Sequence, residues 1–487
     1  MRSNAKAMGL AAASGFALCV GSAVATQSVA VHDIVTPEGV FTVPMDIPVE
    51  PTPGVPTLRS GGWFFDTSPG IGNTVAMGPS HTYGAVGTNA HRLSAFETDG
   101  TGIPVYEVFS ESNSSGGVAA SKGADVVAYL DRFNGDVRVQ AFNSTSNQPL
   151  WSHVFDPTLT IGPANAVAVS RDGSVVAAGA RVSGQNVVIF FNAQTGAQIS
   201  TFEEFDGSLA AIDLSDDGSR AMVSLGNRPR VVDTSNGQLI WSGTGTGAGN
   251  VDYRISGDGD VIAVGGFSLH VYEWDGFSYQ QIINFSTPPT EWFGFGTSVS
   301  RDGSTVASMS RESATDTLNV RVWDVATRTL LHHEILDPVP GTRQTSPRGA
   351  DSSDDGTILA FATWGDGTGV YPEIQVYDRD LNLIAEIDMP GSGYDVAITA
   401  DGSRVVGTGK AVHANVFGSG GQIVLETVDV GPTCPPDLNG DGVVDADDFF
   451  LFLSLFAAGD MRADFNNDGV IDADDFFSFL NAFAAGC

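Results

Sequence analysis

The amino-acid sequence predicts an all-β propeller built from repeated four-stranded units, with a small α-helical domain at the C-terminal end. Three observations support this prediction: a short turn motif that recurs through the middle of the chain, a regular spacing between its copies, and an abrupt change to aspartate-rich sequence after Pro432. A chain of 487 residues is long enough for one large and one small folded part. We therefore expect two folded domains.

The recurring turn has the pattern Ser or Thr, any residue, Asp, Gly, and it stands between two short apolar runs. Glycine readily adopts the positive φ of a tight turn, and aspartate can accept hydrogen bonds from the nearby backbone. Asp-Gly between two strand-like runs therefore predicts a β-hairpin. The six clear copies end at Gly173, Gly218, Gly259, Gly303, Gly356 and Gly402.

Each unit also contains a second hairpin, in which an apolar strand leads through a polar turn into another strand. The run from Val187 to Phe191, followed by the turn Gln194-Thr195-Gly196, is one example. Each unit therefore has four predicted strands. The marker glycines are 45, 41, 44, 53 and 46 residues apart, which is the period of a four-stranded blade repeat and indicates a propeller.

The number of blades depends on two weaker copies of the turn, one around Ser80-His81 and one around Lys122-Gly123. Eight turns predict eight blades; seven blades with one extra hairpin, used as a cap or in closing the ring, are the alternative. The repeat resembles WD40-like and YVTN-type propeller repeats over residues 61–431, and Trp323-Asp324 provides a WD dipeptide. This resemblance implies a propeller and does not select a subfamily.

The first 25 residues have the pattern of a secretory signal peptide. Arg2 and Lys6 give a positive start, Met8 to Val20 is apolar, and Ala23-Val24-Ala25 offers a small-residue cleavage site. The apolar run is shorter than the roughly 20 residues of a membrane-spanning helix. We expect residues 1–25 to be removed, the mature protein to be secreted, extracellular or at the cell surface, and residues 26–60 to form a proline-rich lead-in.

The charge balance restricts the partners of this chain. Its 57 acidic and 23 basic residues give a formal net charge of -34, so the sequence offers little with which to neutralise phosphates. We expect no nucleic-acid partner and no membrane span in the mature chain. The excess of acid favours cations.

Two twelve-residue segments after Pro432 carry oxygen-bearing residues at matching positions, 27 residues apart. Calcium takes six to eight oxygen ligands, which such a loop supplies from positions 1, 3, 5, 7, 9 and 12, with glycine at position 6 for the turn. The first predicted ligand set is Asp437, Asn439, Asp441, Val443 through its carbonyl, Asp445 and Asp448. The second set is Asp464, Asn466, Asp468, Val470 through its carbonyl, Asp472 and Asp475. We predict that two calcium ions bind here.

Each loop precedes one helix-like stretch, 449–458 and 476–485, with an apolar stripe at helical spacing. The stripe consists of Phe449, Phe452, Leu453 and Phe456, then Phe476, Phe479, Leu480 and Phe483. A loop followed by a single helix, present twice with aspartate at position 12, resembles a type I dockerin, and Gly486-Cys487 resembles the end of the GC-type variant. The resemblance covers residues 432–487 and implies attachment to a cohesin-like protein or a cell-surface anchor. Ala446-Asp447 and Ala473-Asp474 stand where dockerins have Ser-Thr-like recognition residues, which leaves the partner open.

Two of the three cysteines bracket this C-terminal domain. Cys19 lies in the predicted signal peptide, which leaves Cys434 and Cys487 as a pair in an exported chain, where disulfides persist. We expect a disulfide between them, contributing roughly 4 kcal/mol on the chain-entropy model. Two free thiols are the alternative.

The propeller sequence contains none of the common catalytic motifs, and we predict no catalytic residue. We expect a secreted or surface-attached binding or scaffold protein, with a glycan or protein ligand on the propeller and attachment through the calcium-binding domain. Phe450 and Phe477, which stand off the apolar stripe of each helix, are candidates for a partner-facing surface. The alternative is a carbohydrate-active enzyme of a dockerin-bearing extracellular complex that degrades polysaccharide, with its active site in the propeller.

Overall fold

The structure is a computed structural model of the chain. It describes residues 31–36, 39–44, 62–87, 91–110, 117–155, 158–160, 166–205, 207–226, 228–246, 252–338, 346–365, 371–413, 420–430, 436, 438, 444–459, 461–465 and 470–486.

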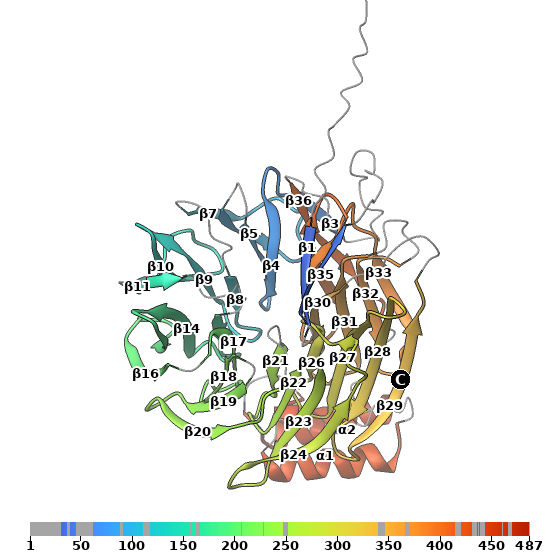
Figure 1. The fold of residues 1–487 in the computed structure, drawn as a ribbon. Coiled ribbons are helices and arrows are strands. Elements are labelled where there is room, and N and C mark those ends of the chain that lie inside the picture. Colours follow the sequence, from blue (N-terminus) through green and yellow to red (C-terminus); the bar gives the residue numbers. More distant parts are fainter. Residues whose placement is uncertain are drawn as a thin grey trace, which may run out of the picture. The chain divides into compact units, whose positions relative to one another are not determined.

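Eight antiparallel sheets of four or five strands form the blades of a β-propeller (Figure 1). Blade 1 contains β4 (Ile71–Met77), β5 (His81–Gly87), β6 (Arg92–Glu97) and β7 (Tyr106–Phe109), and blade 2 contains β8 (Gly117–Ala120), β9 (Val126–Phe133), β10 (Asp136–Asn143) and β11 (Trp151–Phe155). Blade 3 contains β12 (Thr158–Thr160), β13 (Val167–Val169), β14 (Val175–Val182), β15 (Gln185–Asn192) and β16 (Gln198–Glu204). Blade 4 contains β17 (Leu209–Leu214), β18 (Arg220–Leu225), β19 (Arg228–Asp233) and β20 (Gln238–Ser242).

Blades 5 to 8 follow the same order along the chain. Blade 5 contains β21 (Asp252–Ile255), β22 (Val261–Gly265), β23 (Ser268–Trp274) and β24 (Tyr279–Ser286). Blade 6 contains β25 (Glu291–Trp292), β26 (Thr297–Val299), β27 (Thr305–Glu312), β28 (Thr317–Asp324) and β29 (Thr329–Leu336), and blade 7 contains β30 (Pro347–Ser352), β31 (Ile358–Thr363), β32 (Ile374–Asp378) and β33 (Leu383–Ile387). Blade 8 contains β34 (Gly393–Ile398), β35 (Arg404–Lys410), β36 (Gly421–Thr427) and β3 (Trp63–Asp66).

The ring is closed at the centre and at one outer edge. The innermost strands contact one another in the order β4, β8, β13, β17, β21, β26, β30, β34, and β34 contacts β4. At the outer edge, β3 pairs with β36, so that Trp63 lies opposite Leu425 and an early strand completes the last blade. The propeller therefore has eight blades, as predicted, and the seven-blade alternative is wrong.

The predicted turns form as their sequence indicates. In the first clear copy, Ser170 Oγ donates to Asp172 Oδ1 at 2.7 Å, and the backbone N–H of Ser174 donates to the same carboxylate oxygen at 2.9 Å. Gly173 has a φ of +68°. The hydroxyl-to-aspartate bond and the backbone bond recur in the other five turns. These aspartates therefore stabilise turns.

A separate hairpin lies near the start of the chain, in the unit formed by residues 1–48. It consists of β1 (Val31–Thr36) and β2 (Gly39–Pro44), paired with Val35 opposite Val40. The sequence interpretation placed these residues in an extended lead-in and did not predict the hairpin. The predicted signal peptide lies outside the described residues.

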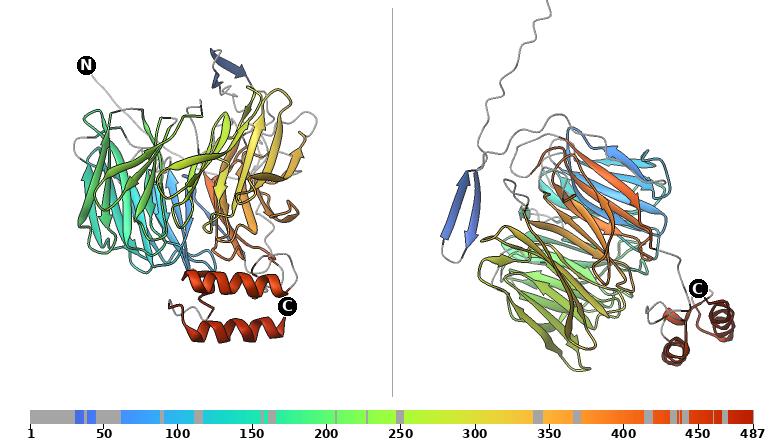
Figure 2. Two further views of the ribbon diagram at one scale, coloured as in Figure 1. Left: turned by 90° about the horizontal axis from the view of Figure 1, so that it is seen from below. Right: turned by 90° about the vertical axis from the view of Figure 1, so that its right-hand side faces the viewer.

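The C-terminal segment contains α1 (Ala446–Ala458), the short 3-10 helix η1 (Met461–Ala463) and α2 (Ala473–Ala485). Figure 2 shows α1 and α2 alongside each other. Both helices begin three residues before their predicted starts. For α2 the reason is a capping box, in which Asp472 caps the helix and the Asp475 side chain accepts the Asp472 backbone N–H.

The two helices share a hydrophobic core whose fully buried phenylalanines are Phe452 and Phe479. Their neighbours in this core also come from the C-terminal segment. Phe450 and Phe477 are 63% and 59% exposed, which confirms that they lie off the core stripe, whereas Leu453, placed on the stripe, is exposed. No helix among the described residues is long and apolar enough to cross a membrane.

Candidate functional site

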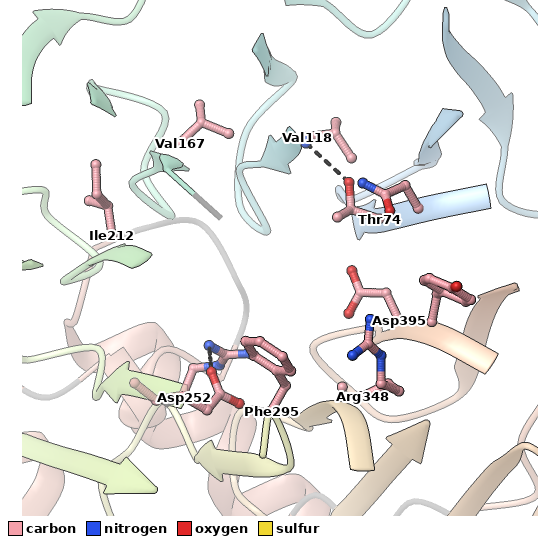
Figure 3. A pocket seen from close by; sticks show the side chains of 12 residues that line it. Thr74, Val118, Val167, Ile212, Asp252, Phe295, Arg348 and Asp395 are labelled. Atoms are coloured by element: carbon pink, nitrogen blue, oxygen red, sulfur yellow. Dashed lines mark hydrogen bonds and ion pairs between the residues drawn. The ribbon is translucent and has the colours of Figure 1, made fainter. Parts of the chain in front are cut away.

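A cavity of about 270 Å³ lies in the central channel of the propeller, and residues from the blades around the ring line it. Figure 3 shows its two unlike walls. Val118 of β8, Val167 of β13 and Ile212 of β17 form an aliphatic wall from consecutive blades. The cavity therefore offers an apolar surface on the side of blades 2 to 4.

The wall contributed by blades 5 to 8 is charged and aromatic. It includes Asp252 of β21, Phe295, which precedes β26, Arg348 of β30, and both Tyr394 and Asp395 of β34. The cavity thus combines an apolar side with a side that can recognise a charged group.

Both cavity aspartates hold neighbouring blades together. Asp252 accepts the backbone N–H of Thr297 in the next blade at 3.1 Å, and Asp395 accepts the N–H of Val75 at 3.1 Å, across the junction of blades 8 and 1. The other oxygen of each carboxylate accepts the N–H of the following residue in its own strand. Asp252 also accepts a hydrogen bond from Arg254 at 2.5 Å.

Two more aspartates make the same bridge deeper in the channel. Asp213 accepts the N–H of Ile255, and Asp351 accepts the N–H of Ile398, both at 3.0 Å. Four junctions between blades are therefore joined by a carboxylate on one inner strand and a backbone donor on the next. Since these bonds are buried or partly buried and join separate blades, these aspartates have a structural role in the ring.

Burial raises the pKa of Asp252 to about 6 and the pKa of Asp395 to about 7. The backbone hydrogen bonds act in the opposite direction, because they stabilise the ionised carboxylate. Raised carboxylate pKa values occur at catalytic sites and in structural networks alike, and the bonds described above favour the structural explanation here.

Arg348 has an unusual environment. Its guanidinium carbon lies 5.5 Å from the ring centre of Phe295, 5.3 Å from that of Trp364 and 5.1 Å from that of Tyr394, all within the range of cation–π attraction. Burial lowers the pKa of Arg348 from its ordinary value. Burial, followed by the positive charge of Arg348, also lowers the pKa of nearby Lys410 to about 8.

Ion pairs cross the channel at the other end of the inner strands. Lys122 of blade 2 pairs with Asp351 of blade 7 at 3.1 Å, and Arg171 of blade 3 pairs with Asp354 in the turn of blade 7. Arg301 of blade 6 pairs with Asp216 of blade 4. Blades 3 and 7 are opposite each other in an eight-bladed ring, so the pair of Arg171 and Asp354 spans the channel.

The predicted calcium loops are only partly within the described chain. Asp437, Asn439, Asp441, Val443, Asn466 and Asp468 lie outside the described residues, as do Cys434 and Cys487, so the ligand sets and the disulfide remain predictions. Among the residues that are described, no three acidic, histidine or cysteine side chains converge closely enough to hold a metal ion.

The described ligand positions show matching geometry in the two loops. Asp448 and Asp475, at position 12 of each loop, are both fully buried. Each accepts the backbone N–H of the position-9 residue, Asp445 at 2.9 Å and Asp472 at 2.8 Å. For Asp475 this bond belongs to the capping box of α2. Asp464 is partly buried, whereas Val470 is exposed.

The residues of the channel cavity were not identified from the sequence. A signal for the aspartates exists: Asp213 and Asp351 stand two residues before the serine of the turn motif, and Asp252 stands four residues before it. Even spacing places side chains on one face of a strand, here the face toward the channel. The aromatic residues around Arg348 come from three blades and share no such spacing.

Comparison with known proteins adds a similarity of fold. No family model matches the sequence, and no curated protein matches it. Among solved structures, the crystal structure of the C-terminal WD40 domain of Sif2 is similar at a TM-score of 0.48 and 17% sequence identity, over 74% of this chain and 97% of that domain. The assignment of eight blades rests on the strand pairing of this chain itself.

Proposed function

We propose that this chain is a secreted or surface-attached binding module without catalytic activity. Its propeller binds a ligand in the channel cavity, and its C-terminal helix pair attaches the protein to a partner in a calcium-dependent manner. The observation that carries this proposal is that both aspartates of the cavity wall hold blades together. They do so next to a space that has one apolar side and one charged, aromatic side.

The arrangement of these acids favours binding over polysaccharide hydrolysis. Most glycosidases need a pair of carboxyl groups that flank the scissile bond, one of which transfers a proton to the leaving oxygen. In Asp252 and Asp395, each carboxylate oxygen already accepts a backbone N–H. Protonation of either carboxylate, which acid–base catalysis requires, would weaken the bonds that join neighbouring blades.

The repeated loop and helix support attachment through the C-terminal segment. The two halves present Phe450 and Phe477 at equivalent positions, and both side chains are exposed. Exposed aromatic side chains at matching positions suit a docking surface. Calcium would order the loops that precede these helices, because a ligand that binds only the folded state stabilises it.

The catalytic question is tested by incubating the full chain with a panel of polysaccharides and measuring both binding and new reducing ends. We expect no turnover above a buffer blank. Release of reducing ends that Asp395→Asn abolishes, while Asp99→Asn does not, would establish the enzyme instead. Asp99 is a suitable control because its side chain is 80% exposed.

The attachment is tested by capturing surface and secreted proteins with the tagged full chain, in calcium and in chelator. We expect a partner that is retained only in calcium and is lost when Asp437→Ala and Asp464→Ala are combined. A partner retained equally in chelator would contradict calcium-dependent docking.

A further inference from the structure

Two arginines line the channel cavity. Arg254 pairs with Asp252, whereas Arg348 lies among aromatic rings from three consecutive blades. Phe295 belongs to blade 6, Arg348 and Trp364 belong to blade 7, and Tyr394 belongs to blade 8. Rings attract the flat faces of a guanidinium, but they do not satisfy the N–H donors at its edges. The edge of Arg348 that faces the cavity therefore remains a donor group.

Within the described parts of the chain, the buried Nε of Arg348 has no acceptor, although Asp395 attracts the guanidinium electrostatically. The nearby carboxylate of Asp395 is already bonded to the backbone of Val75 and Val396. A buried donor without an acceptor is costly, and more so when it carries charge. An anion supplied from solution would remove this cost.

The opposite wall and the volume restrict what such an anion can be. Val118, Val167 and Ile212 offer only aliphatic surface. A volume of about 270 Å³ suits a small organic molecule. Asp252, Arg254 and Asp395 also line the space. Arg254 pairs with Asp252, which leaves Arg348 as the cation for a ligand with Asp395 beside it, so a singly charged anion is favoured over a doubly charged one such as phosphate.

We propose that the channel cavity binds a small organic monocarboxylate. Its carboxylate pairs with Arg348, where the planar guanidinium can donate two parallel hydrogen bonds, and its apolar body lies against Val118, Val167 and Ile212. This assignment rests on the proposed binding function, because it names the ligand class of the same cavity.

Calorimetric titration of the full chain with hexanoate and with hexanamide provides the test. The two probes have nearly the same shape and differ in charge. We expect one hexanoate per chain, with hexanamide and inorganic phosphate each binding at least tenfold more weakly. Equal affinity for the acid and the amide, stronger binding of phosphate, or no binding of hexanoate would overturn the proposal.

Variants locate the site. Arg348→Gln should weaken hexanoate binding at least tenfold, whereas Arg328→Gln, which removes the same charge from a side chain that is 57% exposed, should leave it unchanged. Unaltered affinity in a folded Arg348→Gln variant would refute the assignment. If that variant does not fold, the comparison of hexanoate with hexanamide on the unaltered chain still tests whether the protein binds a carboxylate in preference to its amide.

The outcome also separates this inference from the proposed function. Failure to bind hexanoate, together with saturable binding of a glycan or protein and no turnover, would overturn the ligand class alone. Turnover of polysaccharide would overturn the proposed function whatever the carboxylate titration shows.

Discussion

The rings of Phe452 and Phe479 lie face to face, with their centres 4.0 Å apart and their planes within 1° of parallel. The two residues occupy equivalent positions in the two loop and helix repeats, 27 residues apart. Each repeat therefore buries its own phenylalanine against the same residue of the other. Neither helix can form this core alone, so the duplication is a requirement of the fold.

We expect Phe479→Ala to unfold or strongly destabilise the C-terminal domain, by about 3–5 kcal/mol, since it removes a fully buried ring and leaves a cavity. Scanning calorimetry of the full chain should show the loss of a small transition while the propeller transition is retained. Phe477→Ala, at an exposed position, should change stability by less than about 0.5 kcal/mol. Equal effects of the two substitutions would contradict the assigned core.

The raised pKa of Asp395, about 7, predicts a specific dependence of stability on pH. The folded state holds this proton more tightly than the unfolded state, in which the pKa of an aspartate is about 3.9. The contribution of Asp395 is therefore fully present below about pH 4 and is lost as the pH rises through about 7. Relative to Asp395→Asn, the unaltered chain should lose stability between pH 4 and 8.

Denaturant unfolding at a series of pH values measures this difference. The variant serves as the reference because other titrating groups act on both proteins alike. Asp99→Asn, at a solvent-exposed side chain, should run parallel to the unaltered chain. A pH-independent difference between the chain and Asp395→Asn would show that Asp395 is ionised in the folded state throughout this range.

The ion pair between Arg171 and Asp354 predicts energetic coupling across the channel. Burial raises the pKa of Asp354, and the nearby positive charges act to lower it, so removal of Arg171 leaves a buried carboxylate with less compensation. A double-mutant cycle with Arg171→Gln and Asp354→Asn should give a coupling energy of about 1 kcal/mol or more. The exposed pair Arg328 and Glu273 is the control, with an expected coupling of at most about 0.5 kcal/mol. Similar coupling in both pairs would contradict a special role for the channel pair.

The sequence predicted the repeat because turn chemistry is local. A serine, an aspartate and a glycine within four residues determine the hydrogen bonds of each hairpin, as in Ser170 to Gly173. The spacing of the turns then indicates a blade repeat, and their number predicted eight blades. Ring closure by β3 was not assigned, since the pairing of Trp63 with Leu425 joins distant segments and leaves no local pattern.

The channel site could not be predicted for the same reason. Phe295, Arg348 and Tyr394 are brought together only when three blades close around the axis, and no spacing in the sequence connects them.

The apolar stripes of the two C-terminal helices were predicted almost correctly. Two leucines are exceptions, because the partner helix covers the side occupied by Phe452 and Leu455, which was not placed on the stripe, and leaves Leu453 exposed.

Calcium titration of the full chain, followed by calorimetry, is the most direct test of the proposed attachment domain. We expect two ions per chain and a rise in the unfolding temperature of the small C-terminal transition. Calcium at a hundredfold excess over Kd would stabilise the folded domain by about 2.7 kcal/mol for each site. Asp437→Ala combined with Asp464→Ala should abolish both effects and match the chain in chelator. Absence of binding heat, together with the same unfolding curve in calcium and in chelator, would contradict the calcium assignment.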